Sequence, residues 1–571
     1  MKLPIIILSL FTLGTGISSA QSALGAYGVS QPDMKGTARY MGMAGAFGAL
    51  GGDLSAISQN PAGIGVYRSS DIGFTLDLDL QKSTTENEGM KYGMDQTKFL
   101  LNNIGAVLTM RLPSKTCPNL NFGFTYNKGA SFNRVFGGNI NTLRNSMSNY
   151  IAAVANANEV TEGDVSSSDG INPYEVGSGY FQAPWLTILG YESYLITPQV
   201  TPNGATNWYG LWDNNAMNSD NNTRGSGNFL MQESGSANEF NIVFGGNINN
   251  VLYWGMNFDI INLNYNLTSI WGENLQNALV PDAHNNLIRE SAAWNMNTYY
   301  SLSGTGFNYQ LGFILKPVQP LRLGFAFHTP TWYNLNEQFG GYINYRYADS
   351  QSGVAIANDG IPGYTSYNLR TPWKIIASAA GVIGNNLIVS FDYEWANYGK
   401  MHFSEPNYYD GYGGWYDPWD PWPYSSGAAN LNYVNPNDPF GYENHDIASY
   451  YKSSNTFRVG VEFKPISSLS IRAGYSNVSS PVTKEAKDNK LDIYTSGMTP
   501  SYRFDNSTNY ITFGLGYRYS HVYVDLAYVY KKMDSEYHAF TPDTGDYGLR
   551  SPQSKVSLTN NQVVLSFGYR F

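Results

Sequence analysis

The 571-residue sequence has one cysteine, Cys117, and only 14% charged residues against 15% aromatic ones. A single cysteine excludes an intramolecular disulfide and any metal site built from several thiolates. The net charge of −10 and the absence of a long basic run argue against a nucleic-acid partner. After the N-terminal stretch there is no run of 18 apolar residues, so the sequence offers no candidate for a membrane-spanning helix.

Residues 1–20 are predicted to be a secretory signal peptide. Lys2 supplies a positive start, residues 5–13 are apolar, and Ser18-Ser-Ala20 forms a small-residue cleavage site before Gln21. No cysteine follows the site, which excludes a lipoprotein anchor. An exported, aromatic-rich chain of this kind belongs either in the periplasm or in the outer membrane.

The last nine residues alternate strictly between apolar and polar or small side chains. Val563, Leu565, Phe567, Tyr569 and Phe571 share one face of a predicted strand. A terminal strand that ends on an aromatic residue is typical of the closing strand of a bacterial outer-membrane β-barrel. The alternative is the edge strand of a soluble β-sandwich.

Fourteen segments have strand-like alternation. They begin near residues 71, 103, 120, 239, 252, 306, 320, 373, 386, 455, 468, 510, 522 and 562. The links after even-numbered strands are short and those after odd-numbered strands are long, which is the pattern of tight periplasmic turns and extended outer loops. The sequence therefore predicts an all-β fold, a 14-stranded antiparallel transmembrane β-barrel over residues 71–571. Its largest extracellular loops are expected at 129–238 and 396–454, and both termini in the periplasm.

Residues 21–70 do not have strand patterning. Glycines recur at positions 42, 45, 48 and 51, and Asp53 and Asn60-Pro61-Ala62 follow. Glycine at every third position allows close backbone packing, and Pro61 fixes a turn. From these residues alone the segment is either a tightly packed element or a small-residue lead-in to the barrel.

Gly42, Gly45, Asp53 and Asn60-Pro61-Ala62 resemble the N-terminal hatch of the FadL-type long-chain fatty-acid transporters. Residues 321–330, 373–395 and 463–481 are similar to strands of that family, whereas the long loops are not. The resemblance implies a 14-stranded barrel with the hatch inside the lumen, near an inward-kinked third strand at 121–128. It also implies passive uptake of hydrophobic molecules such as long-chain fatty acids, gated by the hatch and completed through a lateral opening.

Several charged residues are predicted to face the lumen: Arg458, Glu462, Arg472, Arg518, Asp525 and Arg570. One interpretation is an arginine that binds a fatty-acid carboxylate. The other is a network of ion pairs that anchors the hatch and stiffens the barrel.

Trp415, Trp419 and Trp422 lie in a proline-rich stretch of a long loop. They form either an aromatic platform for a sugar, lipid or protein partner or a loop that folds over its own aromatics. The six histidines have no metal-ligand spacing, so neither a metal site nor a cofactor is predicted. Barrel enzymes remain an alternative because a catalytic triad can be hidden in sequence, but the chain is not expected to be an enzyme.

The leading hypothesis is a monomeric outer-membrane channel whose partners are membrane lipid and a hydrophobic small molecule. A second hypothesis is a non-transporting barrel that acts as a scaffold or partner in cell-surface protein or lipopolysaccharide handling. A third, a nonspecific porin, is disfavoured by the predicted hatch.

Overall fold

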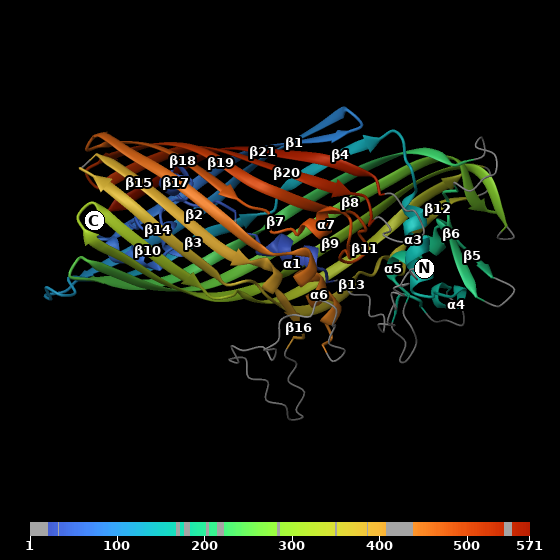
Figure 1. Ribbon diagram of the computed structural model, residues 1–571, viewed down its shortest axis with the longest axis horizontal. Helices are drawn as coiled ribbons and strands as arrows, with labels where there is room; N and C mark the ends of the chain where they lie inside the picture. Colours follow the sequence, from blue (N-terminus) through green and yellow to red (C-terminus); the bar gives the residue numbers. More distant parts are fainter. Residues whose placement is uncertain are drawn as a thin grey trace, which may run out of the picture.

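The computed structural model describes residues 21–31, 33–166, 172–175, 183–200, 205–213, 222–282, 286–348, 351–384, 386–406, 438–541 and 551–571 (Figure 1). The chain forms one elongated barrel with a group of helices at one end (Figure 1). The predicted Trp415, Trp419 and Trp422 platform lies outside the described residues.

Fourteen antiparallel strands form the closed wall, as the sequence predicts. They are β1 (Asp71–Asn87), β2 (Met90–Arg111), β3 (Asn119–Ser131), β7 (Arg224–Ile248), β8 (Leu252–Pro281), β9 (Leu287–Val318), β10 (Leu321–His328), β14 (Lys374–Ile383), β15 (Leu387–Asn397), β17 (Ser453–Ile466), β18 (Leu469–Val478), β19 (Tyr502–Tyr519), β20 (Val522–His538) and β21 (Gln553–Arg570). The first strand closes the barrel on the last, with Asp71 opposite Arg570 and Glu86 opposite Lys555.

Alternation along the strands separates an apolar outer face from a polar inner one. In β1, Ile72, Phe74 and Leu78 are exposed, while the intervening Asp77 and Asp79 are buried. Because backbone groups in a bilayer must all be paired, a closed barrel with an apolar exterior is one of the few folds that can span it. None of the helices that the structure describes is long and apolar enough to cross a membrane.

The strands are much longer than a bilayer requires. β8 has 30 residues and β9 has 32, whereas about 9–11 tilted residues span a membrane. The short turns gather at the end of the barrel that carries Phe571, and the long strands run from there to the opposite end (Figure 1).

Additional strands extend the wall at the far end. They are β4 (Arg134–Ile140), paired with β7; β11 (Trp332–Tyr347), paired with β9; β12 (Gln351–Ile356); β13 (Gly363–Arg370); and β16 (His402–Ser404). The short helix η4 (Ala357–Gly360) follows β12. These pieces continue the barrel where the chain leaves the membrane-facing strands.

A cap closes this far end. It contains α3 (Met147–Ala157), α4 (Glu162–Val165), α5 (Trp185–Glu192), the two-stranded sheet of β5 (Ile196–Val200) and β6 (Thr206–Gly210), η5 (Tyr398–Lys400), α6 (Gly441–Tyr450) and α7 (Lys484–Lys487). Its apolar side chains and those of the strands at this end of the barrel form one buried cluster, which includes Trp271 of β8 and Trp294 of β9.

The strand count is confirmed, but the predicted loops are shorter than expected. The range 129–238 contains β4, β5, β6 and the start of β7, together with helices α3 to α5. The link after the first strand is a two-residue turn, Glu88-Gly89, with φ of 49° and 82°. Above the bilayer no lipid imposes apolar alternation on the outer face, so these strand extensions lack the pattern used to find them.

The N-terminal segment, residues 21–70, lies inside the barrel. It contains α1 (Ala23–Ser30), α2 (Ala38–Met41), η1 (Ala56–Ser58) and η2 (Pro61–Val66). It begins beside α6 in the cap and ends at the short-turn rim, where Ser70 and Phe571 exchange backbone hydrogen bonds at 2.9 and 3.0 Å. Gln21, the first described residue, lies within the lumen towards the cap, because the segment runs through the barrel before β1 starts.

Candidate functional site

The N-terminal segment packs on the wall through closely apposed glycines. A Cβ on Gly42 would stand 3.2 Å from the Cα of Gly514 in β19, and a Cβ on Gly324 in β10 would stand 2.3 Å from the carbonyl oxygen of Gly48. Gly45 has φ of +73°, a conformation that glycine adopts without strain. The backbone of the segment thus packs directly on inward-facing glycines of the strands.

Polar side chains hold the turns of this segment. The carboxylate of Asp53 accepts hydrogen bonds from the Thr37 hydroxyl at 2.9 and 2.8 Å. The amide oxygen of Asn60 accepts one from the backbone N–H of Ala62 at 3.1 Å and caps η2. These contacts fix the local fold of the segment, as expected for Asx-type turn residues.

The turn at Asn60-Pro61-Ala62 faces a different part of the wall from the one predicted. The Pro61 carbonyl would stand 2.1 Å from a Cβ on Gly255 of β8, and the Pro61 Cδ 2.9 Å from one on Gly312 of β9. The third strand is contacted instead by Ile64, whose Cδ1 would stand 3.0 Å from a Cβ on Gly123. The turn packs where two adjacent strands both present glycine.

A chain of ion pairs links the N-terminal segment to the wall. Arg39 Nε lies 3.2 Å from Glu462, which lies 2.6 Å from Arg472, which in turn lies 2.5 Å from Asp525. Arg472, on β18, thus joins carboxylates on β17 and β20, and Arg39 ties the N-terminal segment to the first of them. Removing one member would leave an uncompensated buried charge, which is strongly destabilising.

Two further arginines of the predicted lumen set are also paired. Arg458 Nη2 lies 2.7 Å from Glu394 and Arg570 Nε lies 2.9 Å from Asp71. Arg518 is exposed near the short turn after β19. The five buried or half-buried candidates are therefore engaged in ion pairs, which favours an anchoring network over a free arginine for a carboxylate ligand.

Lysines secure the middle of the segment. Lys35 Nζ lies 2.8 Å from Asp77 in β1, and Lys531 Nζ lies 2.8 Å from Asp33. Burial alone would raise the pKa of Asp33, but the ammonium groups of Lys531 and Lys35 hold it well below its usual range. Asp33 consequently stays charged in the lumen and holds the segment against β20.

The strands β2 and β3 are hydrogen-bonded to each other over only part of their length. Their pairing ends at Asn103 opposite Asn127, and from Met90 to Asn102 β2 pairs only with β1 among the described strands. β4 turns inward, where the inner face of β1 holds it: Ser83 Oγ donates to the Val135 carbonyl at 2.6 Å. One edge of β2 is therefore left without a strand partner.

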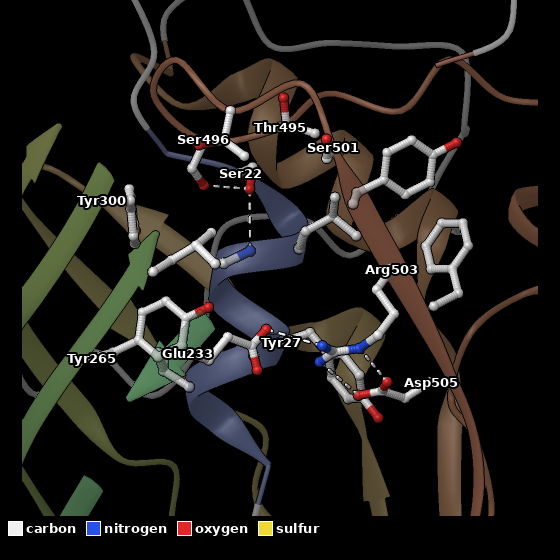
Figure 2. Close-up of a pocket in the computed structure, with 18 of the residues that line it drawn as sticks. Ser22, Tyr27, Glu233, Tyr265, Tyr300, Thr495, Ser496, Ser501, Arg503 and Asp505 are labelled. Atoms are coloured by element: carbon white, nitrogen blue, oxygen red, sulfur yellow. Dashed lines mark hydrogen bonds and ion pairs between the residues drawn. The ribbon is translucent and has the colours of Figure 1, made fainter. Parts of the chain in front are cut away.

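An apolar cavity of about 120 Å³ lies beside α1 (Figure 2). Tyr27, on α1, packs on Tyr451 with ring centroids 4.7 Å apart. Tyr265 and Tyr300 line the cavity on the side of the helix away from Arg503 (Figure 2). At one side, Arg503 forms ion pairs with Glu233 at 3.0 Å and Asp505 at 2.6 Å. The charges that border this cavity are paired with one another, and the rest of its lining is mainly aromatic and aliphatic, with hydroxyl groups such as those of Ser496 and Thr499.

A second cavity, of about 170 Å³, adjoins the first, and both are lined by Val29 and Gln31. It is polar, with Lys374 and Asp259 among its lining residues. It extends to β3 at Asn127 to Gly129, the place where β3 separates from β2. The two cavities together follow α1 from the cap to the part of the wall where β2 and β3 are not paired.

The sequence did not point to the cavity lining. Tyr265 and Tyr300 lie in the extended parts of β8 and β9, and Tyr333 lies in β11, all beyond the predicted strands. The alternating burial of Tyr333, Leu335, Glu337 and Phe339 is the signal that could have located β11. Among the described residues there is no cluster of three or more histidine, cysteine or acidic side chains suited to a metal ion.

No family model matches the chain, and no curated protein matches it. Similar solved structures include a FadL homologue of Pseudomonas aeruginosa, with 12% identity and a TM-score of 0.48 over 95% of this chain and 99% of that one. The toluene transporter TodX of Pseudomonas putida has 12% identity and a TM-score of 0.46 over 94% and 99%. The toluene transporter TbuX of Ralstonia pickettii has 14% identity and a TM-score of 0.44 over 94% and 99%. These structures include a homologue of the family that the sequence resembles.

Proposed function

We propose that the protein is an outer-membrane channel for the passive uptake of hydrophobic molecules. The observation that supports this most is the pair of adjoining cavities beside α1, one aromatic and one polar, which leads towards the free edge of β2. Apolar solutes gain about 0.8 kcal/mol per buried CH₂ on entering a bilayer. A protein route therefore has to carry them only past the polar outer surface.

In this proposal the short turns face the periplasm and the cap faces outwards, as in other barrels of this type. A molecule enters through the cap, occupies the apolar cavity and leaves sideways between β2 and β3. A small movement of residues 21–70, acting as a hatch, connects the two cavities. No energy source is required because the molecule moves down its concentration gradient.

The cavity favours small uncharged molecules in its resting state. Its volume of about 120 Å³ is comparable to cavities of about 150 Å³ that hold one benzene molecule. Arg503 is already paired with Glu233 and Asp505, so a carboxylate would have to compete with two buried acids. A long-chain fatty acid would need the hatch to move before it could bind.

The test is uptake by purified protein reconstituted into vesicles whose outer leaflet is lipopolysaccharide, which supplies the polar surface that the route has to bypass. We expect a neutral monoaromatic compound to enter faster than in protein-free vesicles, and a polar solute of the same size to enter no faster. A long-chain fatty acid, measured in parallel, distinguishes the two hydrophobic substrate classes. Equal rates with and without protein for all hydrophobic probes would contradict the proposal.

A scaffold role is the second candidate, and one surface favours it. Tyr342, Val354, Ile356 and Tyr364 are exposed on β11, β12 and β13, beyond the part of the wall that faces lipid. An apolar patch outside the bilayer is typical of a protein contact. Co-purification of a stoichiometric surface protein that is lost on replacing Val354 and Ile356 with threonine, together with no uptake, would support this candidate instead.

A further inference from the structure

Glu337 is a buried acidic side chain without a cation among the described residues, and burial raises its pKa to about 8. It lies on the inner face of β11 and is 0% exposed. One oxygen accepts hydrogen bonds from the hydroxyls of Tyr300 and Tyr367, each at 2.8 Å, and the other oxygen has no hydrogen-bond partner. No lysine or arginine among the described residues forms an ion pair with it, unlike Glu462 and Asp525 lower in the lumen.

A buried carboxylate normally has a positive partner, because the cost of removing its charge from water is large. Two tyrosine hydroxyls satisfy only one of the two oxygens of Glu337. The open oxygen therefore marks a place where a positively charged donor would be strongly stabilised.

The start of the N-terminal segment lies next to this place. The side-chain amide of Gln21 donates to the Thr365 hydroxyl at 3.1 Å, and Thr365 is the residue paired with Glu337 between β13 and β11. Paired residues of antiparallel strands have side chains on the same face, with Cβ atoms about 4.5–5.5 Å apart. Gln21 is thus bound to Thr365, whose side chain is the neighbour of the Glu337 carboxylate on the same face of the sheet.

The next residues approach Glu337 from its other side. A Cβ on Gly25 would stand 3.7 Å from the Tyr300 hydroxyl that donates to Glu337. Ser22 is fixed by a 2.6 Å contact with Ser496 and accepts from the backbone N–H of Gly25, which caps α1 (Figure 2).

We propose that Glu337 binds the α-ammonium group that cleavage after Ala20 creates on Gln21. The inference rests on the predicted signal-peptide site and on no property of the transported molecule. Processing supplies the missing cation, and the ion pair fixes the first turn of the N-terminal segment between β11 and β13. An unprocessed or extended chain has an uncharged peptide group at this position and cannot form the pair.

The test measures how readily the α-amine of the mature protein reacts. Purified barrel is treated at neutral pH with a limiting amine-reactive ester, and modification of the N-terminal peptide is quantified by mass spectrometry. Three variants are compared with the natural chain: Glu337→Gln, a glycine inserted between Ala20 and Gln21, and the two changes together. Glu405→Gln, at an exposed position, is the matched control.

We expect a free, slowly reacting amine on Gln21 in the natural chain and in Glu405→Gln. Glu337→Gln and the glycine insertion should each raise the labelling rate at least about tenfold, because each breaks the same buried pair. The double variant should react no faster than either single one, since the two changes remove one interaction.

Three results would overturn the proposal. One is a mature chain that begins at a residue other than Gln21. Another is cyclisation of Gln21 to pyroglutamate, which releases ammonia and removes the charge. The third is that Glu337→Gln and the glycine insertion, which leaves Glu337 in place, are both labelled as slowly as the natural chain.

Discussion

The carbonyl oxygen of Gly48 lies so close to Gly324 that a Cβ on Gly324 would stand 2.3 Å away. Gly48 belongs to the N-terminal segment and Gly324 to β10, so this contact sets how deeply the segment sits in the lumen. The neighbouring atoms are backbone and cannot rotate away, so any side chain at 324 has to move the segment itself.

We therefore expect Gly324→Ala to destabilise the seated segment by about 1–3 kcal/mol, the usual cost of overpacking. Limited proteolysis within residues 21–70 should accelerate, while the strands remain protected. Gly381→Ala is the control, because a Cβ there meets nothing within 4 Å. Equal protease resistance of the two variants would show that the segment is not held by this contact.

Arg472→Met tests the ion-pair chain. It leaves Glu462 and Asp525, both buried, without the guanidinium that joins them, and we expect a loss of about 3–5 kcal/mol in the free energy of unfolding. Arg518→Met, at an exposed position, should change stability by less than about 0.5 kcal/mol. Denaturant unfolding in detergent measures both, and similar values would rule out an anchoring role for the network.

Gly28→Leu tests the apolar cavity. Gly28 lines the cavity, and a Cβ there meets nothing within 4 Å, so leucine has room to grow into the space. We expect slower uptake of a neutral aromatic compound with no loss of stability, because replacing glycine within a helix usually gains about 0.5–1 kcal/mol. Gly381→Leu, in β14, is the control, because a Cβ there also meets nothing within 4 Å and Gly381 lines neither cavity. Unchanged uptake in Gly28→Leu would exclude this cavity from the route.

The part of the fold that could be predicted from sequence is the part that lipid constrains. Segments such as residues 511–519 of β19 alternate because one face meets the bilayer, and strands that begin at the short turns, such as β8 at Leu252 and β20 at Val522, start where the sequence predicts. The upper halves of β8 and β9 have solvent or cap on their outer faces, so their sequences follow no fixed alternation. They were consequently assigned to loops.

The site was predictable in composition but not in arrangement. The glycines and Asn60 indicated close backbone packing, and the charged residues expected in the lumen are buried or half-buried in the structure, apart from the exposed Arg518. Which strand each one meets depends on register across the barrel, as with Pro61 at Gly255 and Gly312. Register between distant strands is not encoded in any local pattern.

The account depends most on the lateral route between β2 and β3. If the register of Asn103 with Asn127 continued upwards, Phe99 would face Ser131. In a Cys117→Ser background, Phe99→Cys and Ser131→Cys can be joined across the opening by a short bifunctional maleimide that a reductant cleaves. Leu108→Cys with Phe122→Cys, at positions already paired in the wall, is the matched control.

The most direct measurement is the uptake of a neutral aromatic compound into vesicles with a lipopolysaccharide outer leaflet that contain each cross-linked protein, before and after cleavage of the linker. The account predicts that the Phe99–Ser131 linker slows uptake several-fold and that cleavage restores it, whereas the Leu108–Phe122 linker has no effect. Undiminished uptake through the protein linked at 99 and 131 would contradict the lateral route.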